Sequence, residues 1–215
     1  MIITSSMLTA PPKRGPMDFE RGMRLAPPLL LLLIVANIVV FGWEIATGAL
    51  TSEKSIIAAG ALSRDEVLAG EWWRLLSATF LHGGPDHLIG NMVVLYIVGI
   101  ACEHGFGLLR TGIIYVMSGL AGSLLSMSMS QGPSVGASGA IFGVAAAVIV
   151  MLVRHRDRFH LRDKRISAVL AIWAGYQLLI GFALPFVDNF GHLGGIAGGV
   201  AAAMLLRPRL LGPPS

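Results

Sequence analysis

Six apolar stretches alternate with polar segments along the 215-residue chain. They cover residues 27–50, 88–101, 109–127, 138–153, 166–187 and 192–206. The first, third and fifth reach the ~20 residues that a helix needs to cross a bilayer, whereas the second, fourth and sixth have only about 14 to 16. The pattern predicts six membrane-spanning helices, three of them long and three short.

The composition supports a membrane protein, because 54% of the residues are hydrophobic and only 13% are charged. A soluble domain carries about 25% charged residues. We therefore expect an all-α polytopic membrane protein, with a polar, basic segment at 1–25, a six-helix domain at 26–207 and a short tail at 208–215. The first apolar run is too long for the core of a signal peptide, so we expect it to remain as a span. Cys102 is the only cysteine, which excludes an intramolecular disulfide.

Positive charge predicts the orientation of the spans. Thirteen of the 16 basic residues fall in segments on one side of the predicted membrane, six of them between residues 154 and 165. Lys54, Arg64 and Arg74 are the three on the other side. We expect both termini in the cytoplasm and the long loop 51–86 outside.

Counting from the charged ends of the spans brings four polar residues to similar depths. Ser138 and His192 each lie about 15 or 16 residues before the arginine that ends its span, roughly 23–24 Å along a helix. His87 lies at a similar height, and Asn91 is one turn deeper on the same face. Three spans are thus expected to bring polar side chains together just below the outer membrane surface.

Glycines make contact between two of these spans plausible, since small residues let membrane helices approach closely. Two stripes have this spacing: Gly139, Gly143 and Ala147 in one span, and Gly191, Gly195 and Gly199, with Gly194 and Gly198 beside them, in the other. A lone serine in a membrane helix usually bonds its own backbone, and glycine stripes alone usually serve packing. A histidine within a span is a functional hypothesis by default. The combination of serine, histidine and a His/Asn pair matches the groups needed for acyl transfer, and the non-helical segment 131–135 must line water or be buried in protein.

These residues also carry a resemblance. The chain resembles the rhomboid family of intramembrane serine proteases over residues 73–206. The matching motifs are Gly136-Ala137-Ser138-Gly139, His87-Leu-Ile-Gly-Asn91, Gly191-His192-Leu-Gly-Gly195 and Trp73-Arg74 in the first outer loop, and His82 and Glu103 also fall where the family has a histidine and a glutamate.

The resemblance implies a Ser–His dyad in which Ser138 is the nucleophile and His192 the general base. It also implies an oxyanion hole made by His87, Asn91 and the backbone N–H of Ser138. Phe142 departs from the many relatives that carry tyrosine there, so a polar role at that position is not expected. No acid is assigned to orient His192, and Asp188 in the preceding loop is left without a role.

By resemblance, the substrates are single-span membrane proteins cut in or near their membrane segment, with access involving the fifth span and loop 185–191. No cofactor, metal or nucleic-acid partner is expected, and the lipid bilayer is the other partner. The N-terminal segment does not resemble an organelle transit peptide, which favours a bacterial plasma membrane. Two alternatives stay open: an inactive rhomboid relative that binds membrane proteins, and a transporter or channel. Most inactive relatives lack the serine or histidine, and a transporter would be expected to carry more ionisable residues within its spans.

Overall fold

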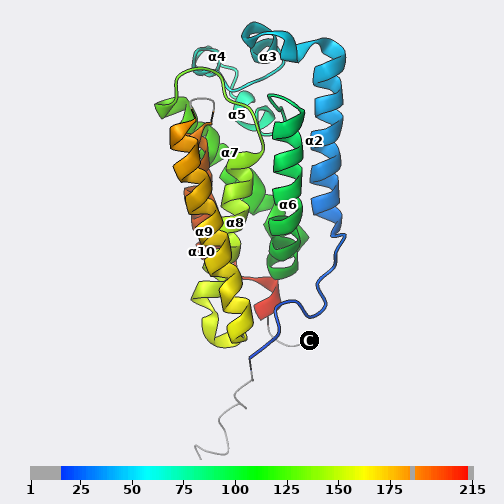
Figure 1. Ribbon diagram of the computed structural model, residues 1–215, viewed down its shortest axis with the longest axis vertical. Coiled ribbons are helices and arrows are strands. Elements are labelled where there is room, and N and C mark those ends of the chain that lie inside the picture. Colours follow the sequence, from blue (N-terminus) through cyan, green and yellow to red (C-terminus); the bar gives the residue numbers. More distant parts are fainter. Residues whose placement is uncertain (1–15, 185–186, 213–215) are drawn as a thin grey trace, which may run out of the picture.

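The computed structural model of the protein describes residues 16–184 and 187–212, and every long element in these ranges is a helix (Figure 1). The six long helices are α2 (Pro28–Thr47), α6 (Pro85–Phe106), α7 (Leu108–Met129), α8 (Ser138–Arg154), α9 (Leu161–Ala183) and α10 (Asn189–Leu205). Five of the long helices contain segments long and apolar enough to cross a membrane, and α8 is a shorter apolar helix. The chain is therefore an integral, multi-pass membrane protein.

The expectation of three short spans is correct for α8 and, by helix length alone, for α10, whose apolar segment nevertheless continues to Leu211 over 23 residues. Helices α8 and α10 have 17 residues each, whereas α6 has 22. The prediction for the second span is wrong because hydropathy ends where polar residues begin, while the helix continues through them. Pro85 occupies the first turn of α6, where its missing N–H costs nothing. Gly107, with a φ of +80°, separates α6 from α7.

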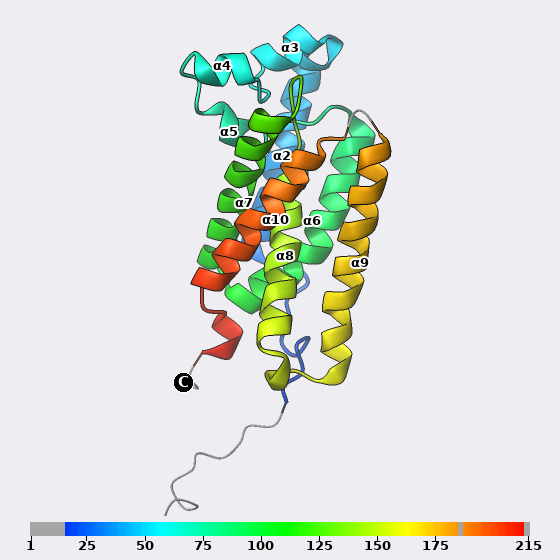
Figure 2. The ribbon, with the colours of Figure 1, turned by 90° about the vertical axis from the view of Figure 1, so that its left-hand side faces the viewer.

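Helix α8 lies at the centre of the bundle and packs against α6, α7, α9 and α10 (Figures 1 and 2). Its residues from Ala140 to Val148 are all buried, and most of them are small or aliphatic. Helix α2 lies on the outside and packs mainly against α6. This arrangement puts the first residue of α8, Ser138, inside the protein near one end of the bundle.

The loop between α2 and α6 forms a cap over that end (Figure 1). The polar sequence there gave no sign of its short helices, which are η1 (Ala49–Thr51), α3 (Glu53–Ala58), α4 (Arg64–Leu68) and α5 (Arg74–Ser77). Leu62, Val67, Leu75 and Ala78 form a small core within the cap. The cap is thus a packed structure rather than a simple connection.

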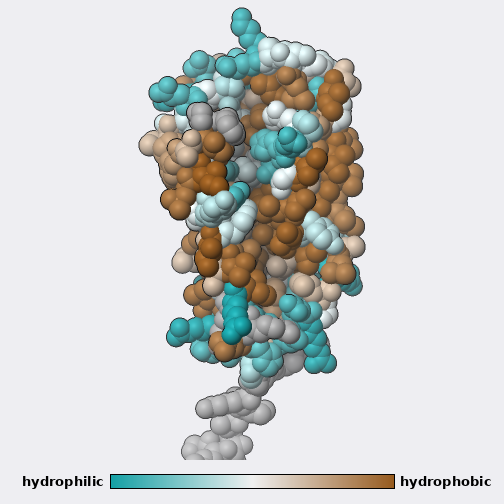
Figure 3. Space-filling model, in the orientation of Figure 1, coloured by the Kyte–Doolittle hydropathy of each residue, from teal (hydrophilic) through white to brown (hydrophobic). Residues whose placement is uncertain are grey.

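Hydrophobic residues cover much of the bundle's length, and hydrophilic residues gather at both ends (Figure 3). Helix α9 is the most exposed candidate span. Only 11% of its most apolar stretch is buried inside the protein, compared with 50% for α6. A helix with so little buried surface has little packing energy holding it in place.

The described part of the N-terminal segment is docked onto the other end of the bundle. Met17 pairs with Phe159 beyond α8, and the backbone N–H of Phe19 donates to Asp163 of α9 at 3.1 Å. Phe19 is 1% exposed and contacts the rings of His104 and Phe159 edge-on. The rest of the proposed terminal segments, residues 1–15 and 213–215, lies outside the described residues.

Candidate active site

Ser138 and His192 meet where the sequence predicted that they would. Ser138 is the first residue of α8, and His192 is the fourth residue of α10. The Oγ atom of Ser138 lies 2.9 Å from Nε2 of His192, which is hydrogen-bond distance. With the ring proton on Nδ1, the hydroxyl donates to Nε2, the arrangement in which an imidazole can accept the proton of a serine.

The approach of α8 and α10 depends on glycine. A Cβ atom on Gly195 would lie 1.9 Å from the carbonyl oxygen of Gly139, and one on Gly199 would lie 2.0 Å from that of Gly143. These contacts confirm the packing predicted from the two stripes. Gly194 instead faces α7, where a Cβ would lie 2.4 Å from the carbonyl oxygen of Ala121. The sequence gave no indication that α7 packs so closely against both helices.

An aromatic stack covers one face of the His192 imidazole. Phe142 stacks on it, and Trp173 of α9 stacks in turn on Phe142. The Nδ1 atom of His192 is buried and has no hydrogen-bond partner among the residues that the structure describes. The imidazole is therefore stacked on Phe142, and within the described residues no carboxylate is hydrogen-bonded to it.

His87 and Asn91, on α6, lie against the segment that leads into Ser138. A Cβ atom on Gly136 would lie 2.8 Å from Nε2 of His87 and 3.5 Å from Nδ2 of Asn91. The φ of Gly136 is +131°, so both space and backbone conformation require glycine there. The Nδ2 group of Asn91 is buried without a partner in the described ranges. Gly83 N–H donates to Nδ1 of His87 at 3.4 Å, which leaves the ring hydrogen on Nε2.

The segment before Ser138 is non-helical, as predicted, and the cap satisfies its backbone. Leu62 and Ser134 exchange two backbone hydrogen bonds of 3.0 and 2.9 Å, and Gly136 N–H donates to the carbonyl of Ala78 at 2.9 Å. Two points of the cap thereby hold the chain that carries the serine.

Arg74 stabilises the cap itself. Its side chain is buried, makes an ion pair of 2.6 Å with Glu71 and donates to the carbonyl of Ala61 at 3.0 Å. Its guanidinium also lies 4.8 Å from the ring centre of the exposed Trp73. Arg74 thereby connects three parts of the cap, at Glu71, Ala61 and Trp73.

The sequence model of the Rhomboid domain matches residues 69–209. The chain belongs to the rhomboid family. The match begins at the end of helix α4 and continues through α10, so it includes His87, Asn91, Ser138 and His192.

Curated relatives include a protein named as a protease and one named as inactive. The chain is 38% identical over 182 residues to "Rhomboid protease GluP" of Bacillus subtilis, covering 84% of this chain and 35% of that protein. It is 43% identical over 155 residues to "RHOMBOID-like protein 5" of Arabidopsis thaliana, covering 70% and 50%. "Inactive RHOMBOID-like protein 8" of Arabidopsis thaliana is 39% identical over 128 residues, 58% of this chain and 35% of that protein. The chain thus spans about a third to a half of the length of these rhomboid relatives.

Two further residues of the rhomboid pattern lie away from the serine. His82 is buried in the cap. Its backbone N–H donates to the Glu44 carboxylate at 3.1 Å, and its ring Nδ1 contacts the carbonyl of Phe80 at 3.2 Å. Burial lowers the pKa of His82 to about 4, with the neighbouring His87 adding to the effect, so His82 is neutral near pH 7. Glu103 lies at the other end of α6 and accepts the backbone N–H groups of Leu29 and Leu30, which begin α2. His82 thus links the cap to Glu44 of α2, Glu103 links α6 to the start of α2, and neither side chain is hydrogen-bonded to Ser138.

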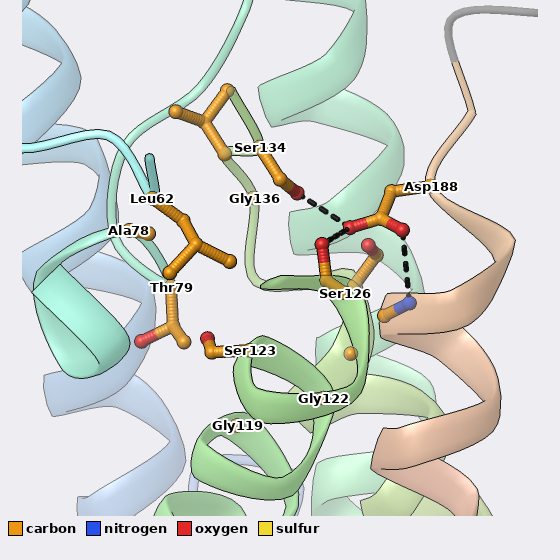
Figure 4. A pocket seen from close by; sticks show the side chains of 14 residues that line it. Leu62, Ala78, Thr79, Gly119, Gly122, Ser123, Ser126, Ser134, Gly136 and Asp188 are labelled. Carbon is orange, nitrogen blue, oxygen red and sulfur yellow. Dashed lines mark hydrogen bonds between the residues drawn. The ribbon is translucent and has the colours of Figure 1, made fainter. Parts of the chain in front are cut away.

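Asp188, to which the sequence assigned no role, is the centre of a hydrogen-bond cluster (Figure 4). Its carboxylate accepts from the hydroxyls of Ser126, Ser130 and Ser134 and from the backbone N–H of Gly191. Burial alone would raise the pKa of Asp188, but these donors outweigh it and hold the pKa below its ordinary value. Asp188 therefore joins the end of α7, the segment before the serine and the start of α10.

A cavity of about 30 Å³ lies beside this cluster and is lined by Ser126, Ser138 and Asp188, among others (Figure 4). It is large enough and polar enough to hold a water molecule. Within the described residues, no group of His, Cys, Asp or Glu side chains could hold a metal ion. Loop 185–191, which we expect to take part in substrate access, lies partly outside the described residues, because 185 and 186 are not among them.

Proposed function

We propose that the protein is an intramembrane serine endopeptidase that hydrolyses peptide bonds in or near the membrane segment of single-span proteins. The observation that carries the proposal is the 2.9 Å contact between Ser138 Oγ and His192 Nε2 in a member of the rhomboid family. In this mechanism Oγ of Ser138 attacks the scissile carbonyl carbon while its proton passes to Nε2 of His192.

The negative charge that develops on the carbonyl oxygen requires donors that are already in position. Asn91 Nδ2, His87 Nε2 and the backbone N–H of Ser138 fill this role, and the unpartnered Nδ2 supports the assignment. Each such donor contributes about 2.7–4 kcal/mol to the transition state of an acyl transfer. The N-terminus of α8 adds a favourable dipole for the same charge.

Three further proton transfers complete the cycle. The protonated His192 donates to the leaving amine as the C–N bond breaks, which leaves an ester on Ser138. A water molecule then attacks the ester and gives its proton to His192, and the second product leaves as Ser138 recovers its hydrogen. The cavity next to Ser138 can hold such a water.

The substrate class follows from the position of the site. A helical substrate keeps its peptide bonds inside its own hydrogen-bond pattern, so cleavage requires a segment with weak helical preference. The exposed α9, whose Trp173 reaches the stack at His192, is the element best suited to move aside for a substrate. We place both termini in the cytoplasm and the protein in a bacterial plasma membrane.

A rhomboid that binds membrane proteins without cleaving them is the second candidate, since one relative is named as inactive. The presence of both Ser138 and His192 at hydrogen-bond distance favours the protease. Labelling of the purified chain by a fluorophosphonate, together with cleavage of a panel of tagged single-span proteins, tests the proposal. Failure of Ser138 to label and of every panel member to be cut would favour the binding protein.

A further inference from the structure

A second cavity lies at the end of the bundle opposite Ser138 and has a volume of about 220 Å³. Arg24, Arg209, Glu103, His104 and Leu108 are among the residues that line it, and we refer to it as the basal cavity. They come from the chain before α2, the end of α6, the start of α7 and the chain after α10. Four separate segments of sequence therefore converge on one space that the proposed proteolysis does not use.

Positive charge in the basal cavity exceeds negative charge, because two arginines and one carboxylate line it. Arg24 and Arg209 make no ion pair within residues 16–184 and 187–212, where the single recorded salt bridge joins Arg74 to Glu71. The Glu103 carboxylate is occupied by the N–H groups that begin α2. The Nε2 atom of His104 is buried without a hydrogen-bond partner in the described part of the chain. Arg24 and Arg209 therefore remain available to bind an anion.

The position of Arg209 is set by the fold. Its stem lies over Gly107, where an added Cβ would be 3.0 Å from Cδ of the arginine. The turn η3 (Arg209–Leu211) packs against α6, and Leu211 is buried there. The guanidinium is thus carried by a docked turn of the chain.

The rim of the basal cavity is apolar. Leu108 lines the cavity and is 49% exposed, and its neighbour Leu109 is 73% exposed. Leu25, beside Arg24, is 71% exposed. A small soluble anion would make no apolar contact with this surface, whereas the acyl chains of a lipid would cover it.

We propose that the basal cavity binds the phosphate group of an anionic phospholipid, with Arg24 and Arg209 as its charge partners. Guanidinium groups bind phosphate oxygens through paired hydrogen bonds, and basic pockets between membrane helices suit lipid head groups. The leucines at the rim contact the start of the acyl chains. The inference concerns lipid recognition and does not depend on proteolysis.

The test uses the full chain in dodecyl maltoside, a neutral detergent that removes the general surface potential of a charged membrane. Native mass spectrometry measures binding of dioleoylphosphatidylglycerol, with dioleoylphosphatidylcholine as the neutral comparison. The double variant Arg24→Gln/Arg209→Gln is compared with Arg21→Gln/Arg207→Gln, which has the same net charge and removes two arginines at the same end that do not line the cavity. Thermal unfolding without lipid checks that both variants are folded, and Arg209→Lys keeps the charge if the double variant is unstable.

We expect one phosphatidylglycerol to bind the wild type more tightly than phosphatidylcholine, and its affinity to fall about tenfold or more in Arg24→Gln/Arg209→Gln. The control pair should change it by less than about threefold, whereas Arg209→Lys, which keeps the charge but loses the paired hydrogen bonds, should give a loss between those of the two double variants. Equal losses in both double variants, or equal affinity for the two lipids, would overturn the proposal. Displacement of the lipid by sn-glycerol 3-phosphate at a comparable concentration would also contradict it, because the site would then recognise a soluble phosphate.

Discussion

Phe142 stacks face to face on His192, with the ring centroids 4.2 Å apart and the ring planes inclined by only 17°. Phe142 lies one turn after Ser138 on α8, so a single helix carries both the proposed nucleophile and the ring that supports its base. Trp173 extends the stack, at 5.1 Å from Phe142. The orientation of the imidazole therefore depends on aromatic packing.

Replacing Phe142 by leucine should lower the rate of cleavage about tenfold or more, because a small displacement of a catalytic group is costly to the rate. The substitution keeps most of the apolar volume but removes the flat surface. Steady-state cleavage of a single-span substrate should give a lower kcat with little change in KM. Phe182→Leu, at a site on α9 that is 66% exposed, is the matched control. An unchanged kcat in Phe142→Leu would mean that the stack does not position His192.

Ser138→Ala and His192→Ala should each abolish cleavage while leaving the protein folded, with loss at every pH in the histidine variant. Ser138→Ala removes one oxygen at a site lined by glycine, so no packing is lost. Ser128→Ala, which removes an exposed hydroxyl from α7, should remain fully active. The measurements are cleavage by purified protein, fluorophosphonate labelling and thermal unfolding. Appreciable cleavage by Ser138→Ala would exclude this serine as the nucleophile.

Asn91→Ala should slow cleavage by up to about a hundredfold with substrate affinity little changed, since its hydrogen bond strengthens in the transition state. His87→Ala should behave in the same way. Separate kcat and KM values distinguish this role from ground-state binding. If either variant lost affinity alone, the residue would instead be a substrate contact.

The sequence predicted the positions of the site residues better than their surroundings. Charge at one end of the spans allowed depth to be counted, and glycine spacing identified the contact between α8 and α10. The role of α7 was missed, because its Gly122 and Ser118 face two partners at once and leave no single stripe. The full length of α6 was missed because hydropathy does not detect polar helical turns.

Asp188 was missed for a different reason. An aspartate just before an apolar run is a common sign of a helix N-cap, and its side chain does accept from Gly191 at the start of α10. Its other three partners come from Ser126, Ser130 and Ser134, more than 50 residues earlier in the chain. No local pattern in a single sequence pairs residues at that separation.

Cysteine labelling should test the orientation of the bundle. Arg156→Cys, beyond α8, should be accessible from the cytoplasm, and Lys54→Cys, in the cap, from the outside, because basic residues favour the cytoplasmic side. Both positions are exposed, and the native Cys102 is fully buried, so background labelling should be low. Labelling of Arg156→Cys by an impermeant reagent added to intact cells would reverse the proposed topology.

Asp188 should contribute to stability in a way that depends on pH. The pKa of Asp188 in the folded protein lies below the ordinary value of 3.8 that the unfolded chain has. The ionised carboxylate therefore stabilises the fold above pH 3.8, and the contribution is lost as the pH falls through the folded pKa. Asp188→Asn keeps an N-cap but loses the charge that its three serine partners share. Thermal unfolding should show the variant less stable than the wild type near pH 7, with the difference shrinking towards pH 3. A constant difference over that range would mean that the charge of Asp188 does not contribute.

The same variant distinguishes an anchoring acid from a triad acid. The Asp188 carboxylate bonds three hydroxyls and the N–H of Gly191, while Nδ1 of His192 has no partner in the described residues. Asp188→Asn should therefore keep the shape of the pH–rate profile, in which activity rises as His192 becomes neutral and then levels off. Its kcat should fall modestly, and Ser134→Ala should lower it to a similar extent, because both changes loosen the segment that leads into Ser138. Loss of the acid from a true triad lowers kcat by about 10⁴-fold. A loss of that size in Asp188→Asn, without a matching loss in Ser134→Ala, would show that the carboxylate acts on His192 during the reaction.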